Sequence, residues 1–542
     1  MDYYPSDEQS SDVIIKEASS TIMDGCYAMM KDEIEYLGWP SGNTYCRHYF
    51  QLAEFPSDNI CLSGKSTDPL FQATTYTMTD NLQNVGTLWM AAYKIINMTN
   101  TVIESLDDSN AENKQTLGEA YFVRALMHLN LVTLFAKPYH PAERGNLGIP
   151  LRTKSISETT QRDLVGNVYD RIVADLQKAA TLMGNSRGNA GYPSKDAALG
   201  LLSRVYLYME NYDDCISTVE KMVGTGIPAA KCKAKLDPNL ATYFANAKTS
   251  SETLFCIAHE ATEDKAQSSI GSMYNGDGGG WGEIYPSATL LNLYERYPDD
   301  IRYKDFIIPQ YKKNAAPSAS LKVYIPNGTA GSEEKRDIIS FPVTYDSSTS
   351  TYSFNDGSTN YTVENRLING EYVEYHINYK GEDLMVRILP SNMDARNTYP
   401  KYYMTKFGYQ DGSPTLSSPV VLRWAEVILN AAEAYARNGN ATKALELVDV
   451  IRTRAGIPAA GMFSGNMHGY ADAIDIVMDE RRMELAFEGH RVFDVYRNKQ
   501  NMDRHYPGLQ AWKTVLYTDP HTLYPIPNAE WTVSHIQQNP GY

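Results

Sequence analysis

One segment decides the fold of this chain: residues 421–456 read VLRWAEVILNAAEAYARNGNATKALELVDVIRTRAG. In its first half, apolar residues recur at the spacing of one buried helix face, at Ala425, Ile428, Leu429, Ala432 and Tyr435, until Gly439 and Asn440 interrupt the run. The second half repeats the pattern at Ala441, Ala444, Leu445, Val448 and Ile451, and stops at Gly456 with Pro458 just beyond. The two halves predict an antiparallel helical hairpin of the tetratricopeptide kind. One hairpin leaves apolar faces uncovered, so further helices must pack on it.

A charged block follows, DERRMELAFEGHRVFDVYR at residues 479–497, in which opposite charges stand three residues apart. The spacing predicts ion pairs along one helical stretch. The predicted pairs are Arg481 with Glu484, Glu488 with Arg491 and Asp494 with Arg497. Exposed pairs of this kind add only about a few tenths of a kcal/mol each, so the block is expected to be structural.

Helical spacing also recurs in the first half of the chain, over residues 14–30, 89–103, 117–135, 168–182, 197–208 and 216–222. With the C-terminal pair, this predicts about eight helices that pair as four hairpins, a mainly α fold. Residues 39–84 are rich in Ser, Thr, Asn and aromatics and are expected to form a loop.

Composition and apolar patterning divide the chain into four regions. We expect an N-terminal tether (residues 1–11), an N-terminal helical region (12–235), an irregular and partly β elaboration (236–419) and a C-terminal helical region (420–542). The elaboration is rich in Gly, Ser, Thr, Asn and Tyr, with strand-like pieces at 321–325, 338–345 and 372–379.

Composition excludes several classes of protein. The 542 residues carry a formal charge of -16, which disfavours nucleic acid as a partner, and no run of 18 apolar residues predicts a membrane-spanning helix. The six cysteines show no CxxC pair and no zinc-ligand spacing, so buried free thiols are expected. A disulfide between Cys46 and Cys61 is allowed by the sequence but not indicated.

An enzyme was the first alternative to test. Glu426 with Glu433, or Asp479 with Glu480, would be the paired carboxylates of a glycosidase, which must face each other across a cleft. Both pairs lie beside arginines in helical patterns, so ion pairing is the simpler interpretation. No histidine motif, nucleophile elbow or phosphate loop is present. We therefore expect no catalytic residue, no cofactor and no metal ligand set, while a bound calcium ion stays open.

Two loops carry aromatic side chains in polar surroundings and are the candidate ligand site. Glycines at 276 and 278–280 present Trp281, and exposed aromatic faces stack on sugar rings while neighbouring polar groups bind the hydroxyls. The alternative for Trp281 is a lid that packs on its own scaffold. The second loop runs from Trp39 to Arg47. The candidate ligand-binding residues are Trp281, Tyr274, Tyr285, Trp39, Asn43, Tyr45 and Arg47.

Five short motifs at the C-terminal end occur together: Arg423-Trp424-Ala425-Glu426, Ala432-Glu433-Ala434, Ile451-Arg452-Thr453-Arg454-Ala455-Gly456, Tyr524-Pro525-Ile526-Pro527 and Gln538-Asn539-Pro540-Gly541-Tyr542. In this order they resemble the SusD/RagB family, surface lipoproteins of Bacteroidota that hand glycans to an outer-membrane transporter. The resemblance covers roughly the last 125 residues, and more weakly the first 225.

The resemblance implies a non-enzymatic, glycan-binding lipoprotein at the surface of the outer membrane. Its expected partner is a TonB-dependent transporter of the SusC kind, and its glycan site would be assembled from loops after the first helix and from the elaboration, packed on the helical scaffold. Family precursors carry a signal that ends in a lipid-modified cysteine; none precedes Asp2, so we expect Met1 to replace that processed terminus and membrane contact to require the missing lipid anchor. Two alternatives stay open, a peptide-capturing member of the family and a ligand-free scaffold for protein contacts.

Overall fold

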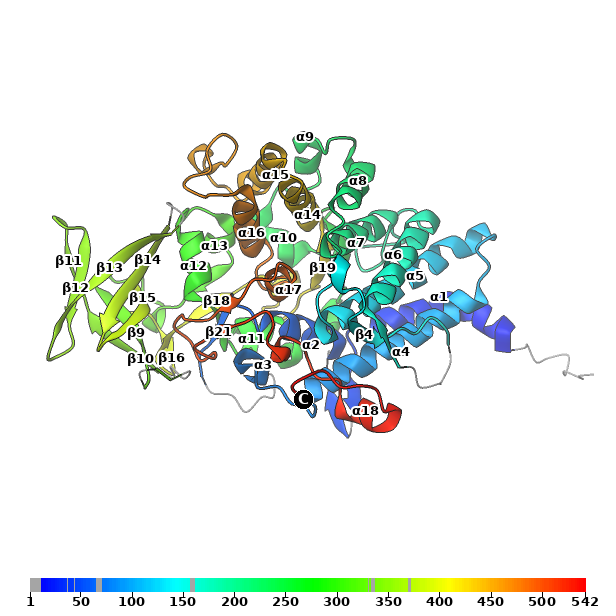
Figure 1. The fold of residues 1–542 in the computed structure, drawn as a ribbon, viewed down its shortest axis with the longest axis horizontal. Helices are drawn as coiled ribbons and strands as arrows, with labels where there is room; N and C mark the ends of the chain where they lie inside the picture. Colours follow the sequence, from blue (N-terminus) through cyan, green and yellow to red (C-terminus); the bar gives the residue numbers. More distant parts are fainter. Residues whose placement is uncertain are drawn as a thin grey trace, which may run out of the picture.

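The computed structural model describes residues 11–36, 38–42, 44–64, 71–155, 161–329, 331–332, 337–368 and 372–542 (Figure 1). Helices make up most of the body and a β-sheet projects from one end of it, at the left in Figure 1. The predicted mainly α fold with a partly β mid-chain region is confirmed. The predicted tether lies outside the described residues except for Ser11, which begins the first helix.

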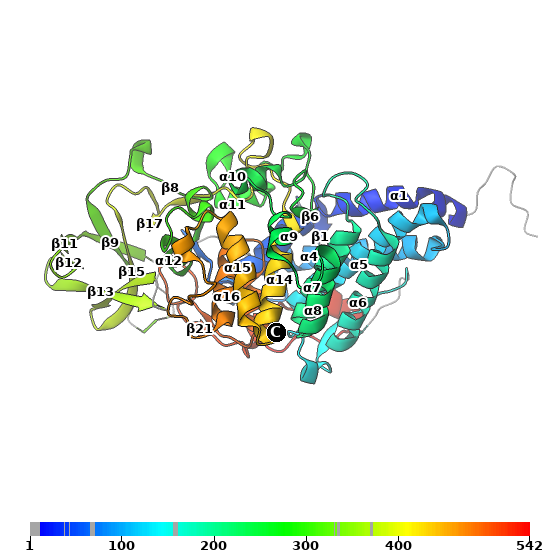
Figure 2. The ribbon, with the colours of Figure 1, turned by 90° about the horizontal axis from the view of Figure 1, so that it is seen from above.

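The N-terminal helices are α1 (Ser11–Met29), α2 (Thr44–Glu54), α3 (Phe71–Thr75), α4 (Gln83–Ser105), α5 (Lys114–Phe135), α6 (Val165–Leu182), α7 (Lys195–Tyr208) and α8 (Tyr212–Val223). Helices α4 to α8 pack each on the next, and α8 packs on α14, so that α5 to α8, α14 and α15 lie side by side in Figure 2. The prediction of a loop over 39–84 is wrong in part, because α2 and α3 fall inside it. Buried residues of α2 such as Phe50 and Leu52 join the main core, which explains why this stretch folds.

The predicted hairpin is present as α14 (Trp424–Arg437) and α15 (Ala441–Arg454), preceded by β19 (Val420–Arg423). Gly439 has a φ of +79°, a left-handed conformation that glycine adopts without steric cost. The side chain of Asn440 then caps α15 by accepting a hydrogen bond from the Lys443 amide at 3.1 Å. Gly439 and Asn440, which interrupt the apolar pattern in the sequence, therefore end α14 and begin α15.

The charged block is not one helix. It forms α16 (Ala473–Glu484) and α17 (Arg491–Arg497), separated by a turn in which Phe487 and Gly489 have φ values of +69° and +77°. A Cβ on Gly489 would lie 3.0 Å from the methyl group of Ala53, so α2 packs closely against this turn.

Two of the three predicted ion pairs are wrong. Asp494 and Arg497 pair as expected, at 2.7 Å. Arg481 instead contacts Asp494 at 3.0 Å, while Glu488 contacts Arg423 at 2.8 Å. The i, i+3 rule describes neighbours on an exposed helix surface. Here the charged side chains are buried and meet partners from other segments, so the surface rule does not apply.

The mid-chain region is more regular than predicted. A seven-stranded antiparallel sheet has the order β10-β9-β15-β14-β13-β12-β11. Its strands are β9 (Leu321–Asn327), β10 (Asp337–Pro342), β11 (Thr344–Asp346), β12 (Thr351–Asn355), β13 (Asn360–Ile368), β14 (Tyr372–Tyr379) and β15 (Glu382–Pro390). Strands β10 and β12 also contact each other, with the rings of Phe341 and Phe354 stacked at 5.4 Å, so the sheet curls toward closure.

Alternation along the strands gives the curled sheet two differently buried faces. Val323 and Ile325 of β9 and Val386 of β15 face a small core of the sheet itself, which Trp512 from the C-terminal region helps to close. The residues between them, Tyr324 and Met385 among others, join the main core. Alternate side chains therefore fill the sheet and fasten it to the helical body.

A polar contact reinforces this attachment. The guanidinium of Arg387 pairs with Glu295 at 2.6 Å and donates to the Asn292 side chain at 2.6 Å, both on α12 (Ala288–Glu295). The main core contains Leu126, Leu290 and Ile428, residues from all three predicted regions after the tether. The predicted packing of the elaboration on the scaffold is therefore observed, while the region boundaries themselves stay predictions.

The remaining elements are short. They are β1 (Ile34–Tyr36), β2 (Trp39–Ser41), β3 (Ile60–Leu62), β4 (Leu147–Pro150), β5 (Arg162–Leu164), α9 (Ala229–Lys233), α10 (Leu240–Tyr243), β6 (Thr253–Cys256), α11 (Gly271–Tyr274), β7 (Ile284–Pro286), α13 (Ile301–Lys304), β8 (Ile307–Pro309), β16 (Ala395–Arg396), β17 (Tyr399–Pro400), β18 (Tyr402–Met404), β20 (Met502–Asp503), β21 (Thr514–Val515) and α18 (Asn528–Ser534).

All six cysteines are buried free thiols, as predicted. Burial raises the pKa of the Cys26 and Cys61 thiols to about 12.

No helix among the described residues has the length and apolar character needed to cross a membrane.

Candidate functional site

The glycine-rich loop between α11 and β7 presents Trp281 at the surface. Gly278, Gly279 and Gly282 have φ values of +64°, +84° and +52°, which only glycine adopts readily. The Trp281 side chain remains 44% exposed. Its indole Nε1 donates to the Gln267 carbonyl oxygen at 3.3 Å, so the edge of the ring is held while much of its surface faces solvent.

The loop backbone is held from a second side by Arg396 of β16. One guanidinium nitrogen donates to the Trp281 carbonyl oxygen at 2.5 Å, and another pairs with the Glu283 carboxylate. These contacts cross-link two segments that are far apart in sequence. They fix the direction in which Trp281 projects.

Two tyrosines that the sequence analysis missed complete an aromatic surface around this loop. Tyr409 is 36% exposed, and its hydroxyl donates to Asp277 at 2.8 Å and accepts from the Asn275 side chain at 3.2 Å. Tyr403 is half-buried and lies directly against the loop, because a Cβ on Gly276 would sit 2.3 Å from its hydroxyl oxygen. The aromatic residues and the Asp411-Gly412 turn nearby were a local signal, but nothing in the sequence connected them with Trp281.

The structure also brings the second predicted loop close to the first. Trp39 lies on β2, paired with Tyr36 of β1, although its side chain and the whole of Asn43 lie outside the described residues. A Cβ on Gly42 would be 3.4 Å from the Ser268 hydroxyl oxygen. Ser268 follows Gln267, which holds the Trp281 ring. The two candidate loops are therefore neighbours.

Tyr45 and Arg47 lie on α2, beyond this second loop. Tyr45 is 1% exposed, with its ring stacked at 6.1 Å from that of Tyr49 and its hydroxyl accepting a hydrogen bond from Asn130. Its predicted contact with ligand is wrong, because the apolar face of α2 turns it inward. Arg47 is half-buried on the same helix.

Tyr274 and Tyr285 are likewise corrections, since each is only 1% exposed. Tyr274 ends α11 and packs between Phe407 and Phe487, at ring distances of 6.0 and 5.6 Å. Tyr285 belongs to β7, paired with Cys61 of β3, and burial raises its pKa to about 12. Both stand close to Trp281 in sequence, but regular structure on each side of the glycine loop directs them into the core. Their predicted contact with ligand at this surface is wrong.

The basic groups Arg396 and Lys401 near Trp281 are paired with carboxylates, while the exposed Asp277 carboxylate accepts a hydrogen bond from Tyr409. Arg396 pairs with Glu283, and Lys401 lies 3.5 Å from Asp394 while its ammonium sits 4.9 Å from the centre of the Tyr403 ring. In the part of the chain that the structure describes, no group of three His, Cys, Asp or Glu side chains is placed to hold a metal ion. The site therefore offers aromatic surface, neutral hydrogen-bonding groups and the Asp277 carboxylate.

Three of the four carboxylates considered for catalysis, Glu426, Glu433 and Glu480, are buried in ion pairs, while Asp479 accepts a hydrogen bond from the Tyr470 hydroxyl. Glu426 contacts Arg204 and Glu433 contacts Arg497, each at 2.6 Å. Burial alone would raise the pKa of Glu426, but Arg204 and His490 bring it below its usual value. These side chains hold helices together, in agreement with the prediction of a structural role.

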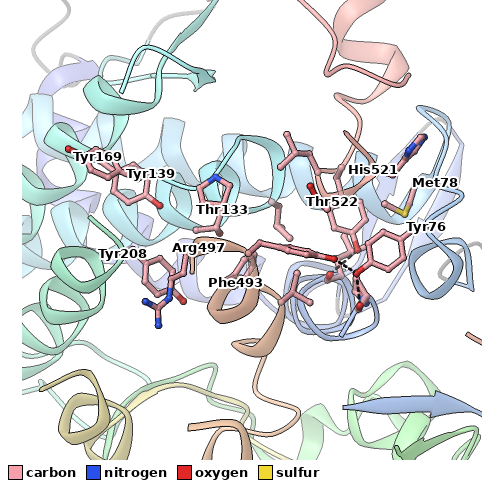
Figure 3. A pocket seen from close by; sticks show the side chains of 18 residues that line it. Tyr76, Met78, Thr133, Tyr139, Tyr169, Tyr208, Phe493, Arg497, His521 and Thr522 are labelled. Atoms are coloured by element: carbon pink, nitrogen blue, oxygen red, sulfur yellow. Dashed lines mark hydrogen bonds between the residues drawn. The ribbon is translucent and has the colours of Figure 1, made fainter. Parts of the chain in front are cut away.

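A separate hollow lined by aromatic side chains lies between the C-terminal segment and helices α5, α6 and α17. Tyr76, Tyr139, Tyr169, Tyr208, Phe493 and Tyr496 line it (Figure 3). Its free volume is about 30 Å³, the space of a single water molecule. This space is too small for a sugar ring.

Comparison with known proteins identifies the class to which this helical fold and its loop-borne surface belong. The family model described as "SusD family" matches residues 245–542, and one described as "Starch-binding associating with outer membrane" matches residues 5–207. The chain belongs to the SusD family, as the C-terminal motifs predicted.

Individual relatives agree with this assignment. SusD-like protein P2 of Formosa agariphila is 24% identical over 499 residues, which cover 87% of this chain and 83% of the relative. A SusD superfamily protein from Bacteroides thetaiotaomicron superposes with a TM-score of 0.69 at 21% identity, covering 97% of this chain and 99% of the other. A SusD-like carbohydrate binding protein from Bacteroides vulgatus gives a TM-score of 0.63 at 15% identity, covering 96% of each chain. At these identities the solved structures establish the fold.

Proposed function

We propose that this protein binds a neutral glycan chain on the surface formed by Trp281, Tyr403 and Tyr409, without acting on it chemically. The observation that carries the proposal is the geometry of Trp281. Its ring edge and its backbone are both tied down, yet 44% of the side chain stays exposed. An aromatic surface that is both fixed and exposed is unfavourable unless something covers it.

A sugar ring fits this surface chemically. The C–H face of a pyranose stacks on an aromatic ring, and its hydroxyls require hydrogen-bonding groups at the margin. Gln267 and Asp277, both exposed, supply an amide and a carboxylate group there. The family description of starch binding and the description of the Bacteroides vulgatus relative as a carbohydrate binding protein support the same ligand class.

Delivery to a transporter is the second part of the proposal. The family description places such proteins in association with the outer membrane. We infer a surface-exposed lipoprotein that closes over a SusC-like TonB-dependent transporter and releases glycan into it. Co-purification of the two proteins from outer membranes would test this part separately from ligand binding.

The binding proposal is tested by affinity electrophoresis against a panel of plant, host and microbial polysaccharides. Trp281→Ala should weaken binding to the retained polysaccharide by roughly 1 to 3 kcal/mol, the range for losing a central aromatic anchor. The melting temperature should change little, because the side chain is not part of the core. Trp39→Ala should cost less, if its loop forms only the margin of the surface.

Trp531 provides a matched control. It is also exposed, at 38%, and its Nε1 also donates a hydrogen bond, to Asp80 at 3.3 Å, but it lies on α18. Trp531→Ala should bind glycan normally. Normal binding by Trp281→Ala would refute the proposed site, release of new reducing ends would refute the non-enzymatic assignment, and retention of oligopeptides instead of glycans would favour a peptide-capturing function.

A further inference from the structure

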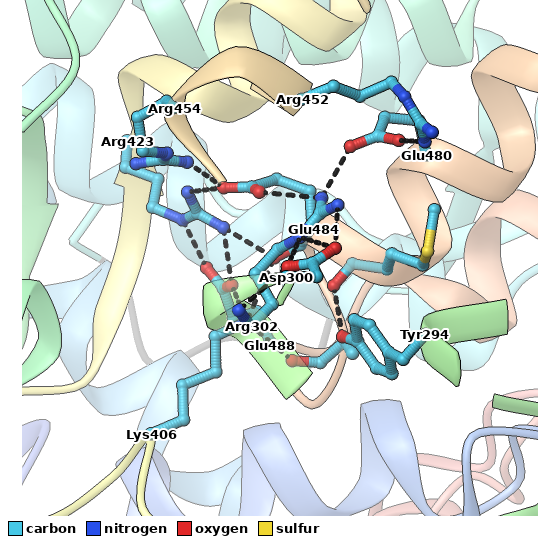
Figure 4. A network of polar contacts seen from close by, with 12 residues as sticks. Tyr294, Asp300, Arg302, Lys406, Arg423, Arg452, Arg454, Glu480, Glu484 and Glu488 are labelled. Carbon is cyan, nitrogen blue, oxygen red and sulfur yellow. Dashed lines mark hydrogen bonds and ion pairs between the residues drawn. The ribbon is translucent and has the colours of Figure 1, made fainter. Parts of the chain in front are cut away.

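A network of buried charges lies where the segment around Lys406 meets helices α15 and α16 (Figure 4). Its basic members are Arg302, Lys406, Arg423, Arg452 and Arg454, and its acidic members are Glu252, Asp300, Glu480, Glu484 and Glu488. Positive and negative groups are equal in number, so the network is neutral as a whole. Removing one charge would leave an uncompensated charge inside the protein.

Lys406 is the member of this network that comes from the binding surface. Its ammonium pairs with Glu488 at 2.5 Å and donates to the carbonyl oxygens of Glu484 at 3.0 Å and Ala486 at 2.9 Å. In Figure 4 its side chain extends alone from one side of the network toward Glu488. It therefore fastens its own segment to the turn between α16 and α17.

The segment that Lys406 fastens carries both tyrosines of the site. Tyr403 precedes it by three residues and Tyr409 follows it by three. The neighbouring Phe407 presses against α11, since a Cβ on Gly271 would lie 2.0 Å from its carbonyl oxygen. Helix α11 in turn leads into the glycine loop that presents Trp281. Lys406 is thus connected to the aromatic surface through Phe407, α11 and the glycine loop, which pack closely on one another.

The backbone after Lys406 needs such support. Tyr409 and Asp411 have φ values of +65° and +52°, a left-handed conformation that costs free energy for residues other than glycine. A strained backbone conformation persists only where surrounding contacts hold it in place. Tyr409 and Asp411 adopt this conformation at the point where the Tyr409 side chain turns outward to the surface.

We infer that Lys406 and Glu488 form a positioning pair, which holds the Tyr403–Tyr409 segment in the conformation that binds glycan. This inference rests on the proposed function and adds to it the structural origin of the site's geometry. A buried ion pair is often no more stabilising than a well-packed apolar pair of similar size. Its contribution here is to direct one lysine to one place, since an ammonium among a carboxylate and two carbonyl groups has few alternative positions.

The test uses the charge-balanced variant Lys406→Met with Glu488→Gln in the full chain, and the polysaccharide that wild-type protein retains. Removing one charge of each sign avoids leaving an unpaired charge, so the melting temperature should fall by less than in Lys406→Met alone. Affinity should fall about tenfold in the double variant. An unchanged affinity would overturn the inference.

A matched control separates positioning from general loss of a buried pair. Arg124 and Asp175 pair at 2.7 Å, both buried, on α5 and α6, which supply no residue of the site. Arg124→Met with Asp175→Asn should leave affinity unchanged. Equal losses in the two double variants would also overturn the inference, because the effect would then be global.

The loss of affinity caused by Tyr409→Ala, compared between wild-type protein and the double variant, distinguishes positioning from a purely structural role. In wild-type protein this substitution removes a positioned ring, so it should weaken binding; in the Lys406 and Glu488 double variant the ring is already displaced and the added loss should be small. Strictly additive losses would refute positioning. If the double variant does not fold, Lys406→Arg replaces it, and wild-type affinity in that variant would count against the inference. Normal binding by Trp281→Ala is a different outcome, since it refutes the proposed site itself.

Discussion

The buried charge network around Arg423 and the loop around Trp281 use their side chains in opposite ways. In the network, charged groups such as Arg423 and Glu484 are buried and satisfied by each other. In the loop, the side chains of Gln267 and Arg396 secure the backbone at the carbonyl groups of Gly279 and Trp281, while an apolar ring is left exposed. Burial of charge makes the first region costly to alter. Exposure of apolar surface makes the second one suited to binding and cheap to alter.

The strongest test of this contrast removes the centre of the network. Arg423→Ala should lower the free energy of unfolding by roughly 3 to 5 kcal/mol, because it leaves buried carboxylates without their partner. Arg423 contacts Glu484 at 2.6 Å, Glu488 at 2.8 Å and Glu252 at 3.1 Å. Urea denaturation measures the effect.

Arg437→Ala is the control for this prediction, since Arg437 is exposed at the end of α14 and donates to the Asn498 side chain. It should cost less than about 0.5 kcal/mol. A loss of similar size in both variants would mean that burial of the charges does not distinguish the two regions.

A buried carboxylate outside the network gives the second prediction. Burial raises the pKa of Glu54 to about 7, against the opposing hydrogen bonds from Asn59, Gly489 and Ser57. A carboxyl group whose pKa is higher in the folded protein binds more protons there, so stability should fall as pH rises from about 4.5 to about 7. The shift corresponds to a contribution on the order of 3 kcal/mol across that window.

Glu54→Gln should remove this part of the pH dependence, measured as the melting temperature between pH 4.5 and pH 8. Glu33→Gln, at an exposed position, serves as control and should leave the profile unchanged. An identical slope in wild type and Glu54→Gln would show that Glu54 does not ionise in this range.

Glu488 has the opposite pH dependence. Arg423 and Lys406 overcome the effect of burial and hold the pKa of Glu488 at about 2, so its contribution to folding stability is lost only as pH falls below about 4.5.

How far the sequence predicts each region follows from the range of the interactions involved. Gly439, Asn440 and Gly456 act on their own neighbours, so the hairpin could be predicted from local spacing. The ion pair predicted between Arg481 and Glu484 is wrong because the spacing rule assumes an exposed helix surface. The same limit applies at the site, where Trp281 was identifiable from its glycines. Tyr403 and Tyr409 reach it from a distant segment, and Tyr274 and Tyr285 are adjacent in sequence but buried.

The third prediction returns to the exposed region. Tyr409→Ala should weaken glycan binding by about 1 to 2 kcal/mol while the melting temperature stays close to that of wild type. Tyr345→Ala is a matched control, because Tyr345 is 51% exposed but lies on β11 of the curled sheet. Isothermal titration calorimetry with an oligosaccharide of the retained polysaccharide separates them, and equal losses would mean that aromatic exposure alone does not define the site.

The smallest expected effect is the one of salt on binding, and it tests the electrostatic half of the comparison. Near Trp281, Arg396 is already paired with Glu283 and Lys401 lies near Asp394, and the exposed Asp277 carboxylate has little attraction for a ligand without charge. Stacking and neutral hydrogen bonds are little affected by screening, whereas attraction between exposed charges fades once the Debye length shortens, from about 10 Å at 0.1 M salt to about 3 Å at 1 M. Affinity for the glycan should therefore change by less than about twofold over that range. A steep fall would show that the ligand carries negative charge and that Arg396 or Lys401 leaves its partner to bind it. The glycan would then be acidic, and Arg396→Gln would be expected to abolish the salt dependence.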